Sequence, residues 1–116
     1  MLLTMLKSKL HGAVVTSCLP DYEGSIAIDR SLLRAAGILP NEKVLVASLA
    51  NGNRLETYAI PAEEGSGTVS LNGAAAFLGS PGDRLIVLAF ALMPPTQARK
   101  HRPKVLRLTR KNRPAD

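Results

Sequence analysis

The fold is decided by residues 21–60, which read DYEGSIAIDRSLLRAAGILPNEKVLVASLANGNRLETYAI. Within this stretch a helix is predicted over Arg30–Ala36, because Asp29 can cap its first turn and Gly37 suits the position just after its last turn. A short extended piece precedes the cap. The stretch therefore begins with a strand that leads directly into a short helix.

A tight hairpin follows this helix. Pro40-Asn41 returns the chain to a strand predicted over residues 43–49. Asn51-Gly52 is a strong turn signal, and it connects this strand to a second one over residues 54–60. Two paired strands are therefore expected beside the helix.

The rest of the chain alternates short strands with turns. We expect strands at residues 4–16, 69–71 and 84–93, a second short helix at residues 74–78, and an edge strand at residues 105–109. Many short strands with two short helices predict a mainly β protein, built as a small closed barrel. We expect one barrel domain over residues 1–103, followed by a basic, partly disordered tail over residues 104–116.

Composition excludes several classes of protein. The chain of 116 residues is long enough for one domain. Its longest apolar run, residues 85–93, is far shorter than the roughly 20 residues of a membrane-spanning helix, and residues 1–10 lack the apolar segment of a signal peptide. A cytoplasmic protein without a membrane partner is expected. One cysteine, Cys18, and two histidines predict neither an internal disulfide nor a metal site.

The positive charge is concentrated at one end of the chain. The formal net charge is +6, which is typical of some nucleic-acid-binding proteins. Residues 99–116 hold eight basic residues and one acidic residue, whereas residues 1–98 hold seven basic and eight acidic residues. The barrel is therefore nearly neutral, and this distribution argues against a nucleic-acid partner.

The segment Tyr22-Glu23-Gly24-Ser25 resembles the processing site of the pyruvoyl-dependent aspartate 1-decarboxylases. Further matches to this family occur in the same order, at residues 5–11, 35–39, 51–54, 57–60 and 72–76. The resemblance covers about residues 1–103. It implies a double-psi β-barrel, a homotetramer, and the conversion of L-aspartate to β-alanine and carbon dioxide for pantothenate biosynthesis.

The resemblance also implies that the cofactor is made from the chain itself. The hydroxyl of Ser25 would attack the carbonyl carbon of Gly24, and the chain would be cut into residues 1–24 and 25–116. Ser25 would become a pyruvoyl group, which binds aspartate as a Schiff base and acts as an electron sink. Gly24 is expected to tolerate a strained and crowded backbone because it lacks a side chain.

Strand alternation groups the candidate substrate-binding residues. Lys9 and His11 share one face of their strand, and Arg54 and Tyr58 share one face of another. Two cations in one pocket suit a dicarboxylate, which arginine can hold with two parallel hydrogen bonds. The resemblance implies that Lys9, His11 and Arg54 bind aspartate and that Tyr58 donates the proton to the carbanion.

The remaining site residues rest on the resemblance alone. Thr57 is implied in substrate contact and in processing, although alternation turns it away from Tyr58. Asn72 is implied to donate a hydrogen bond to the oxyanion during processing, and the other residues implied in processing are Gly24, Ser25 and Thr57. The backbone of Gly73, Ala74 and Ala75 is implied to contact the substrate.

Two other interpretations stay open. Residues 28–46, a capped helix followed by a strand, also resemble the barrels of AbrB-like DNA-binding proteins, although those would carry basic residues on the barrel itself. An inactive homologue that is never processed would have the same sequence pattern. The rate of cleavage, the need for a maturation helper protein, and the effect of Ala47, where many family members carry an aromatic residue, are open as well.

Overall fold

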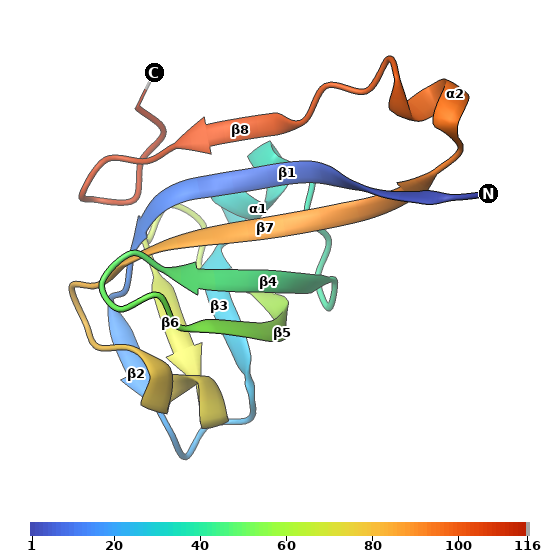
Figure 1. The fold of residues 1–116 in the computed structure, drawn as a ribbon. Helices are drawn as coiled ribbons and strands as arrows, with labels where there is room; N and C mark the ends of the chain where they lie inside the picture. Colours follow the sequence, from blue (N-terminus) through green and yellow to red (C-terminus); the bar gives the residue numbers. More distant parts are fainter. Residues whose placement is uncertain (116) are drawn as a thin grey trace.

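The computed structural model describes residues 1–115, which form one body with dimensions of 43 × 30 × 25 Å (Figure 1). The elements in chain order are β1 (Leu3–Val14), β2 (Ser17–Leu19), β3 (Ser25–Asp29), α1 (Arg30–Ala36), β4 (Lys43–Ser48), β5 (Arg54–Ala62), β6 (Val69–Asn72), the 3₁₀ helix η1 (Gly73–Leu78), β7 (Arg84–Met93), α2 (Pro95–Ala98) and β8 (Lys104–Arg107). The expectation of a mainly β protein is confirmed.

The strands are hydrogen-bonded in the order β2-β6-β3-β5-β4-β7-β1-β8. β1 lies between β7, to which it is antiparallel, and β8, to which it is parallel (Figure 1). Within residues 1–115 no ladder joins β2 to β8, so closure of the barrel by hydrogen bonds stays a prediction. The sheet curves around one apolar core, which contains Leu10, Ile26, Leu32, Val46 and Val87.

The junction of β3 and α1 follows the sequence-based expectation in detail. Asp29 is fully buried, and its carboxylate accepts hydrogen bonds from the backbone N–H groups of Ser31 (2.9 Å), Gly65 (3.0 Å) and Gly67 (2.9 Å). Burial alone would raise the pKa of Asp29, but the hydrogen bonds from Gly67, Ser31 and Gly65 outweigh it and lower this pKa to about 2. Gly37 ends the helix in the left-handed conformation, with φ of 70°.

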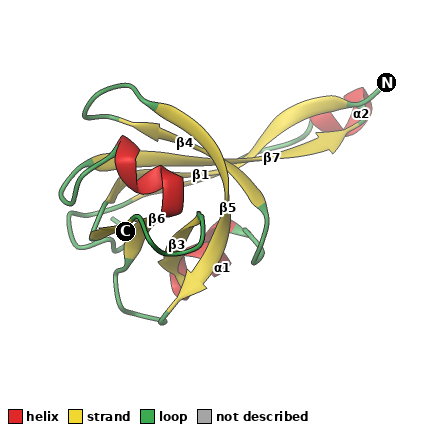
Figure 2. Ribbon diagram, turned by 90° about the horizontal axis from the view of Figure 1, so that it is seen from below, coloured by secondary structure: helices red, strands yellow, loops and turns green. Residues whose placement is uncertain are grey.

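Two short elements were not predicted. β2 follows β1 after two residues and pairs in parallel with β6. α2 raises the number of short helices from the expected two to three, and it starts at Pro95, a residue that is favoured in the first turn of a helix. The first half of β1 and the second half of β7 form a two-stranded arm that ends near α2 (Figure 2).

The C-terminal segment packs on the body. The edge strand expected at residues 105–109 is present as β8, but the expectation of a partly disordered tail over residues 104–116 is wrong for the described residues. Lys104–Arg107 form β8, Leu108 is buried, and Asn112 is only 1% exposed. The Asn112 side chain accepts a hydrogen bond from Val14 N (2.7 Å) and donates to the carbonyl oxygens of Val14 (2.9 Å) and Gly67 (2.8 Å). Apolar burial and these three hydrogen bonds hold residues 104–115 against β1. The last residue of the predicted tail, Asp116, lies outside the described residues.

No helix within residues 1–115 combines the length and the apolar character that a membrane crossing requires.

Candidate active site

Ser25 is the first residue of β3 and is 1% exposed. It lies opposite Asn72, because β3 pairs in antiparallel orientation with β6 and the two residues are in register. Asn72, also buried, donates a hydrogen bond from Nδ2 to the Ser25 hydroxyl oxygen at 3.2 Å. The sheet register therefore brings together two of the four residues predicted for processing, Ser25 and Asn72.

Asn72 is itself held by a chain of hydroxyl groups. Ser17 Oγ donates to Ser70 Oγ at 2.8 Å, and Ser70 Oγ donates to Asn72 Oδ1 at 2.8 Å. With its oxygen occupied as an acceptor, the Asn72 amide must present its nitrogen to Ser25. Sequence reasoning missed Ser17 and Ser70. Ser70 had a usable signal, since it lies two residues before Asn72 on one strand and therefore faces the same side.

A cavity of about 190 Å³ opens beside this pair. Its lining residues are Gly24, Ser25, Leu55, Glu56, Thr57, Asn72, Ala74, Ala75 and Leu78. Five of these residues are small or apolar, and the polar ones are Ser25, Glu56, Thr57 and Asn72. We call this space the Ser25 cavity.

Thr57 lines this cavity because strand alternation turns it away from Tyr58, which is the same alternation that made its place in the site hard to explain from the sequence. Along β5 the residues alternate between exposed and half-buried, and Thr57 and Leu55 are half-buried. Alternation turns Thr57 toward Ser25 because it turns Tyr58 away. No bulge in β5 is needed to explain this position.

Close packing of the backbone requires a glycine at position 73 and not at position 24. A Cβ atom added to Gly24 would meet no atom within 4 Å, and the Gly24 backbone is not left-handed, so neither space nor φ requires glycine there. A Cβ on Gly73, whose φ is +63°, would lie 2.7 Å from Gly24 Cα and 3.1 Å from the carbonyl oxygen of Tyr22. Gly73 therefore lets the segment before Ser25 approach the start of η1 closely.

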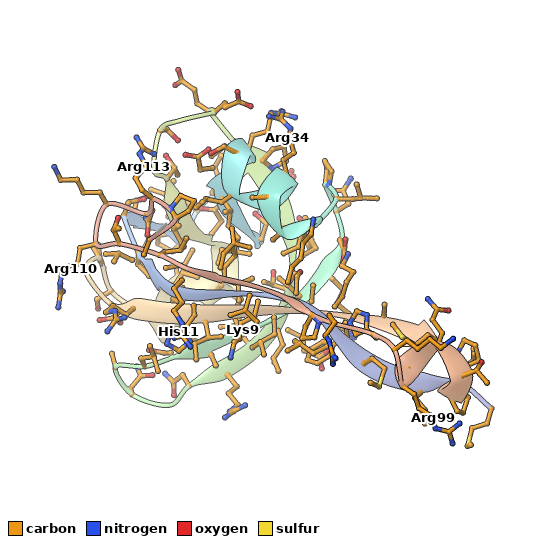
Figure 3. All side chains as sticks on the ribbon, turned by 90° about the horizontal axis from the view of Figure 1, so that it is seen from above. Lys9, His11, Arg34, Arg99, Arg110 and Arg113 are labelled. Carbon is orange, nitrogen blue, oxygen red and sulfur yellow. The ribbon has the colours of Figure 1, made fainter. Side chains whose placement is uncertain are left out.

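The predicted substrate-binding side chains lie on a different surface. His11, Ile86, Ala47 and Arg54 are in register across β1, β7, β4 and β5, so their side chains share one face of the sheet. Lys9 lies two residues before His11 on β1, and Tyr58 lies four residues after Arg54 on β5. Because side chains alternate along a strand, both point to the same side of the sheet as this row. We call this surface the cationic face, and Figure 3 shows Lys9 and His11 side by side on it.

His11 has an unusual environment on the cationic face. Its Nδ1 atom is buried and has no hydrogen-bond partner within the described residues. Burial lowers the pKa of His11, and the positive charges of Lys9, Arg107 and Arg84 lower it further. The imidazole is therefore neutral near pH 7.

The structure thus gathers the predicted residues into two groups. The Ser25 cavity holds Gly24, Ser25, Thr57, Asn72, Ala74 and Ala75, with Gly73 packed against Gly24. None of Lys9, His11, Arg54 and Tyr58 lines this cavity. Within residues 1–115 no three potential metal-binding side chains lie together. The first group offers a nucleophile with an oriented amide donor, and the second offers cations and a phenol.

Comparison with known proteins adds independent information. The family model described as aspartate decarboxylase matches residues 1–115. The chain is 54% identical over 106 residues to the aspartate 1-decarboxylase of Clostridium beijerinckii, covering 91% of this chain and 86% of the relative. It is 56% identical to that of Carboxydothermus hydrogenoformans, covering 91% and 84%, and 54% identical to that of Caulobacter vibrioides, covering 97% and 95%.

Proposed function

The chain belongs to the aspartate decarboxylase family, and we propose that it decarboxylates L-aspartate to β-alanine with a pyruvoyl group made from its own Ser25. The observation that carries the proposal is the hydrogen bond from Asn72 Nδ2 to the buried Ser25 hydroxyl, at 3.2 Å, within a cavity that also contains Gly24. A buried serine oriented by an amide at a cavity wall is a candidate nucleophile. Membership of an enzyme family favours this function over an AbrB-like DNA-binding module.

The first reaction in the proposal is self-cleavage. The Ser25 oxygen attacks the carbonyl carbon of Gly24, and the peptide bond becomes an ester as the Ser25 nitrogen is released from the carbonyl. Asn72 Nδ2 carries two hydrogens, so one can orient Ser25 while the other stabilises the oxygen of Gly24 as it gains charge. Elimination of the ester frees residues 1–24 with a carboxyl end, and hydrolysis of the resulting dehydroalanine releases ammonia and leaves the pyruvoyl group on residue 25.

The surroundings of Ser25 fit this group. Ala74, Ala75 and Gly24 contribute little side-chain volume, and the cavity of about 190 Å³ lies directly at Ser25. Once formed, the pyruvoyl group would supply an electron sink that allows carbon dioxide to leave the α-carbon of aspartate. Thr57 and the backbone of Gly73–Ala75 would contact the substrate there, and no metal is required.

The second group of residues supplies charge and a proton in the proposal. Lys9 and Arg54, with His11 beside them, would bind the two carboxylates of aspartate, and arginine does so with two parallel hydrogen bonds. Tyr58 would donate the proton to the carbanion, since a positioned phenol can act as a general acid.

Because these residues do not line the Ser25 cavity of the same chain, we propose that a neighbouring copy brings the two groups together in a homotetramer. Exposed apolar side chains support such an assembly: Leu2, Phe77, Phe90 and Leu92 are between 42% and 78% exposed. Large apolar side chains left in contact with water are typical of association surfaces. We also propose that the enzyme is cytoplasmic and feeds pantothenate and coenzyme A biosynthesis, with a maturation helper protein as an open alternative.

The experiment is an intact-mass spectrum of the purified protein under denaturing conditions, followed over time at raised temperature. We expect two fragments, residues 1–24 and residues 25–116, the second with a blocked N-terminus. Ser25→Ala should remain one chain, because it lacks the nucleophile. The cleaved protein should release β-alanine from aspartate and much less carbon dioxide from asparagine, whose amide cannot form the second ion pair.

A wild-type chain that stays uncut and releases no β-alanine would contradict the proposal and favour the unprocessed homologue. Cleavage only after addition of a cell extract would point to the helper protein. Equal release of carbon dioxide from aspartate and asparagine would remove the argument for two carboxylate sites.

A further inference from the structure

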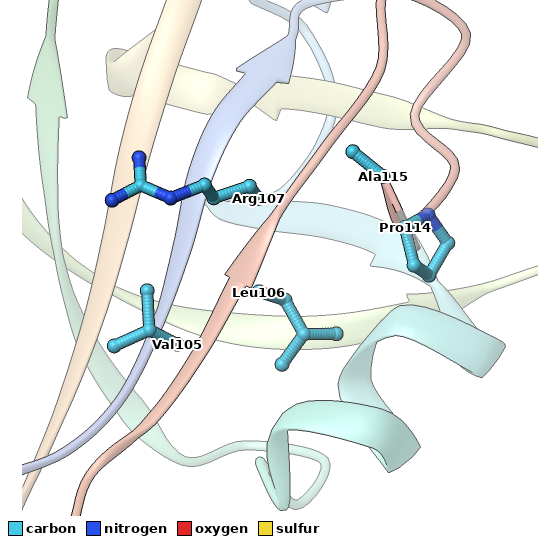
Figure 4. A pocket seen from close by; sticks show the side chains of 5 residues that line it. All are labelled: Val105, Leu106, Arg107, Pro114 and Ala115. Atoms are coloured by element: carbon cyan, nitrogen blue, oxygen red, sulfur yellow. The ribbon is translucent and has the colours of Figure 1, made fainter.

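Arg107 brings a cation from the C-terminal segment to the edge of the cationic face. β8 runs parallel to β1, with Arg107 in register with His11 and Val105 in register with Lys9. Leu106 packs against the apolar core, so its neighbours Val105 and Arg107 face the opposite side, where Lys9 and His11 lie. Figure 4 shows the Arg107 side chain extending across β1, away from Leu106.

A further cation comes from the start of β7. The Arg84 guanidinium lies over Gly12, at 2.9 Å from the position that a Cβ of Gly12 would occupy. Gly12 is the bulged residue that follows His11 in β1. Lys9, Arg84 and Arg107 therefore surround His11 from three strands, and after burial, which is the largest single cause, their charges lower the pKa of that histidine further.

None of these three cations is neutralised within residues 1–115. The ion pairs of this part of the chain are Lys7–Glu42, Arg34–Glu64, Lys43–Glu56 and Arg113–Asp29. The mutual repulsion of like charges makes such a cluster unfavourable unless an anion lies among them. A concentration of unpaired positive charge also attracts anions from solution and accelerates their binding.

The cluster continues into the proposed substrate site. Arg107, His11, Ile86, Ala47 and Arg54 form one row of registered residues across β8, β1, β7, β4 and β5. Arg54 thus stands at one end of the row, and Arg107 stands at the other end, next to Lys9 and His11. The row gives cations on both sides of the apolar pair Ile86 and Ala47.

We propose that Arg107 is a further substrate-binding residue, which forms with Lys9 and His11 an anion site that attracts the dianionic substrate and holds one of its carboxylates. This inference rests on the proposed function. It also gives β8 a role in selecting a dicarboxylate, which the sequence did not indicate, because the basic residues of this segment were read as a solvated tail.

The test compares Arg107→Gln and Arg107→Lys with the control Arg110→Gln, which removes one positive charge from an exposed position of the same segment. Each variant is first shown by intact mass to be cleaved and by thermal unfolding to be folded. For Arg107→Gln we expect KM for aspartate to rise about tenfold with kcat changed less than twofold, and the dependence of kcat/KM on salt to become weaker. Arg107→Lys should recover part of the loss, and Arg110→Gln should match the wild type.

Binding of succinate, measured by calorimetry, gives a second readout that needs no turnover. Succinate is a dicarboxylate without the amine, and its affinity should fall about tenfold in Arg107→Gln and stay unchanged in Arg110→Gln. Wild-type values of KM and of succinate affinity in Arg107→Gln would overturn the assignment of Arg107, whereas a wild-type protein that binds succinate and releases no β-alanine would overturn the proposed function alone. An equal loss of substrate and succinate affinity in Arg110→Gln would show that the effect comes from the net charge of the segment and not from Arg107 itself. That result would also overturn the assignment.

Discussion

Gly73→Ala should slow self-cleavage while leaving the fold in place. Two costs follow from the structure. The first is conformational, because φ of +63° is a left-handed backbone that costs an L residue about 1–2 kcal/mol. The second is steric, because the new methyl group would lie 2.7 Å from Gly24 Cα, whereas ordinary contacts begin at 3.4 Å. The backbone at Gly24, where the proposed cleavage occurs, must therefore move by several tenths of an ångström.

The size of the effect follows from that displacement. A shift of about 1 Å at a reacting centre can cost about 10² in rate, so we expect cleavage of Gly73→Ala to be about tenfold to a hundredfold slower. The assay is the fraction of uncut chain in intact-mass spectra, taken at intervals after purification at constant temperature. Urea unfolding measures the stability of the same samples.

Gly52→Ala is the matched control. Gly52 has φ of +77°, so alanine there carries a similar conformational cost, but a Cβ atom would meet nothing within 4 Å. It should lose stability like Gly73→Ala and cleave at the wild-type rate. Wild-type cleavage in Gly73→Ala, or equal slowing in both variants, would refute the role assigned to the close approach of Gly73 and Gly24.

Two further predictions concern single side chains. Tyr58→Phe should be cleaved normally, because Tyr58 does not line the Ser25 cavity, yet release β-alanine roughly 10² to 10⁴ times more slowly, the usual contribution of a positioned general acid; normal turnover in a β-alanine assay would assign the proton to another group. Asp29 has its pKa lowered from 3.8 to about 2 in the folded protein, so its ionised form contributes about 2 kcal/mol to the free energy of unfolding. This contribution is fully present above pH 3.8 and is lost as the pH falls toward 2. Asp29→Asn should be less stable than the wild type by that amount at neutral pH, and its urea midpoint should change less than that of the wild type between pH 4 and 2. Parallel curves of urea midpoint against pH for the two proteins would contradict this account.

Local signals were sufficient to predict α1 and the hairpin between β4 and β5. Asp29, Gly37 and Asn51-Gly52 act through hydrogen bonds and backbone conformations within a few residues of themselves, and the bounds of α1 match the prediction residue for residue. β2 is different, because Ser17–Leu19 becomes a strand only by pairing with β6, far along the chain. The packing of residues 110–115 was missed for the same reason, since Asn112 is fixed by Val14 and Gly67, which are distant in sequence.

The sequence was sufficient to predict which residues belong to the candidate site, but not how they are placed relative to one another. The residues of the Ser25 cavity were named from a family resemblance, and alternation along β5 already separated Thr57 from Tyr58. What the sequence does not contain is the register of β3 with β6, which brings Asn72 to Ser25, and the register of β8 with β1, which brings Arg107 to His11. Both depend on pairings between strands that are distant in sequence.

The proposed cleavage would make the processed enzyme a complex of two polypeptides, with β1 on the shorter one. Cleavage after Gly24 would leave β1 and β2 on a peptide that is no longer covalently joined to the other strands. That peptide lies between β7 and β8, pairs with β6, and contributes Leu10, Ala13 and Val15 to the core.

To fold, the cut protein must rebind a separate peptide, so its stability depends on the concentration of both polypeptides. Uncut Ser25→Ala has no such requirement, because residues 1–24 stay joined to the rest of the chain. Loss of the peptide would expose the facing edges of β7 and β8, and unpaired strand edges are prone to aggregate. After cleavage, residues 25–116 would therefore stay folded only while residues 1–24 remain bound to them.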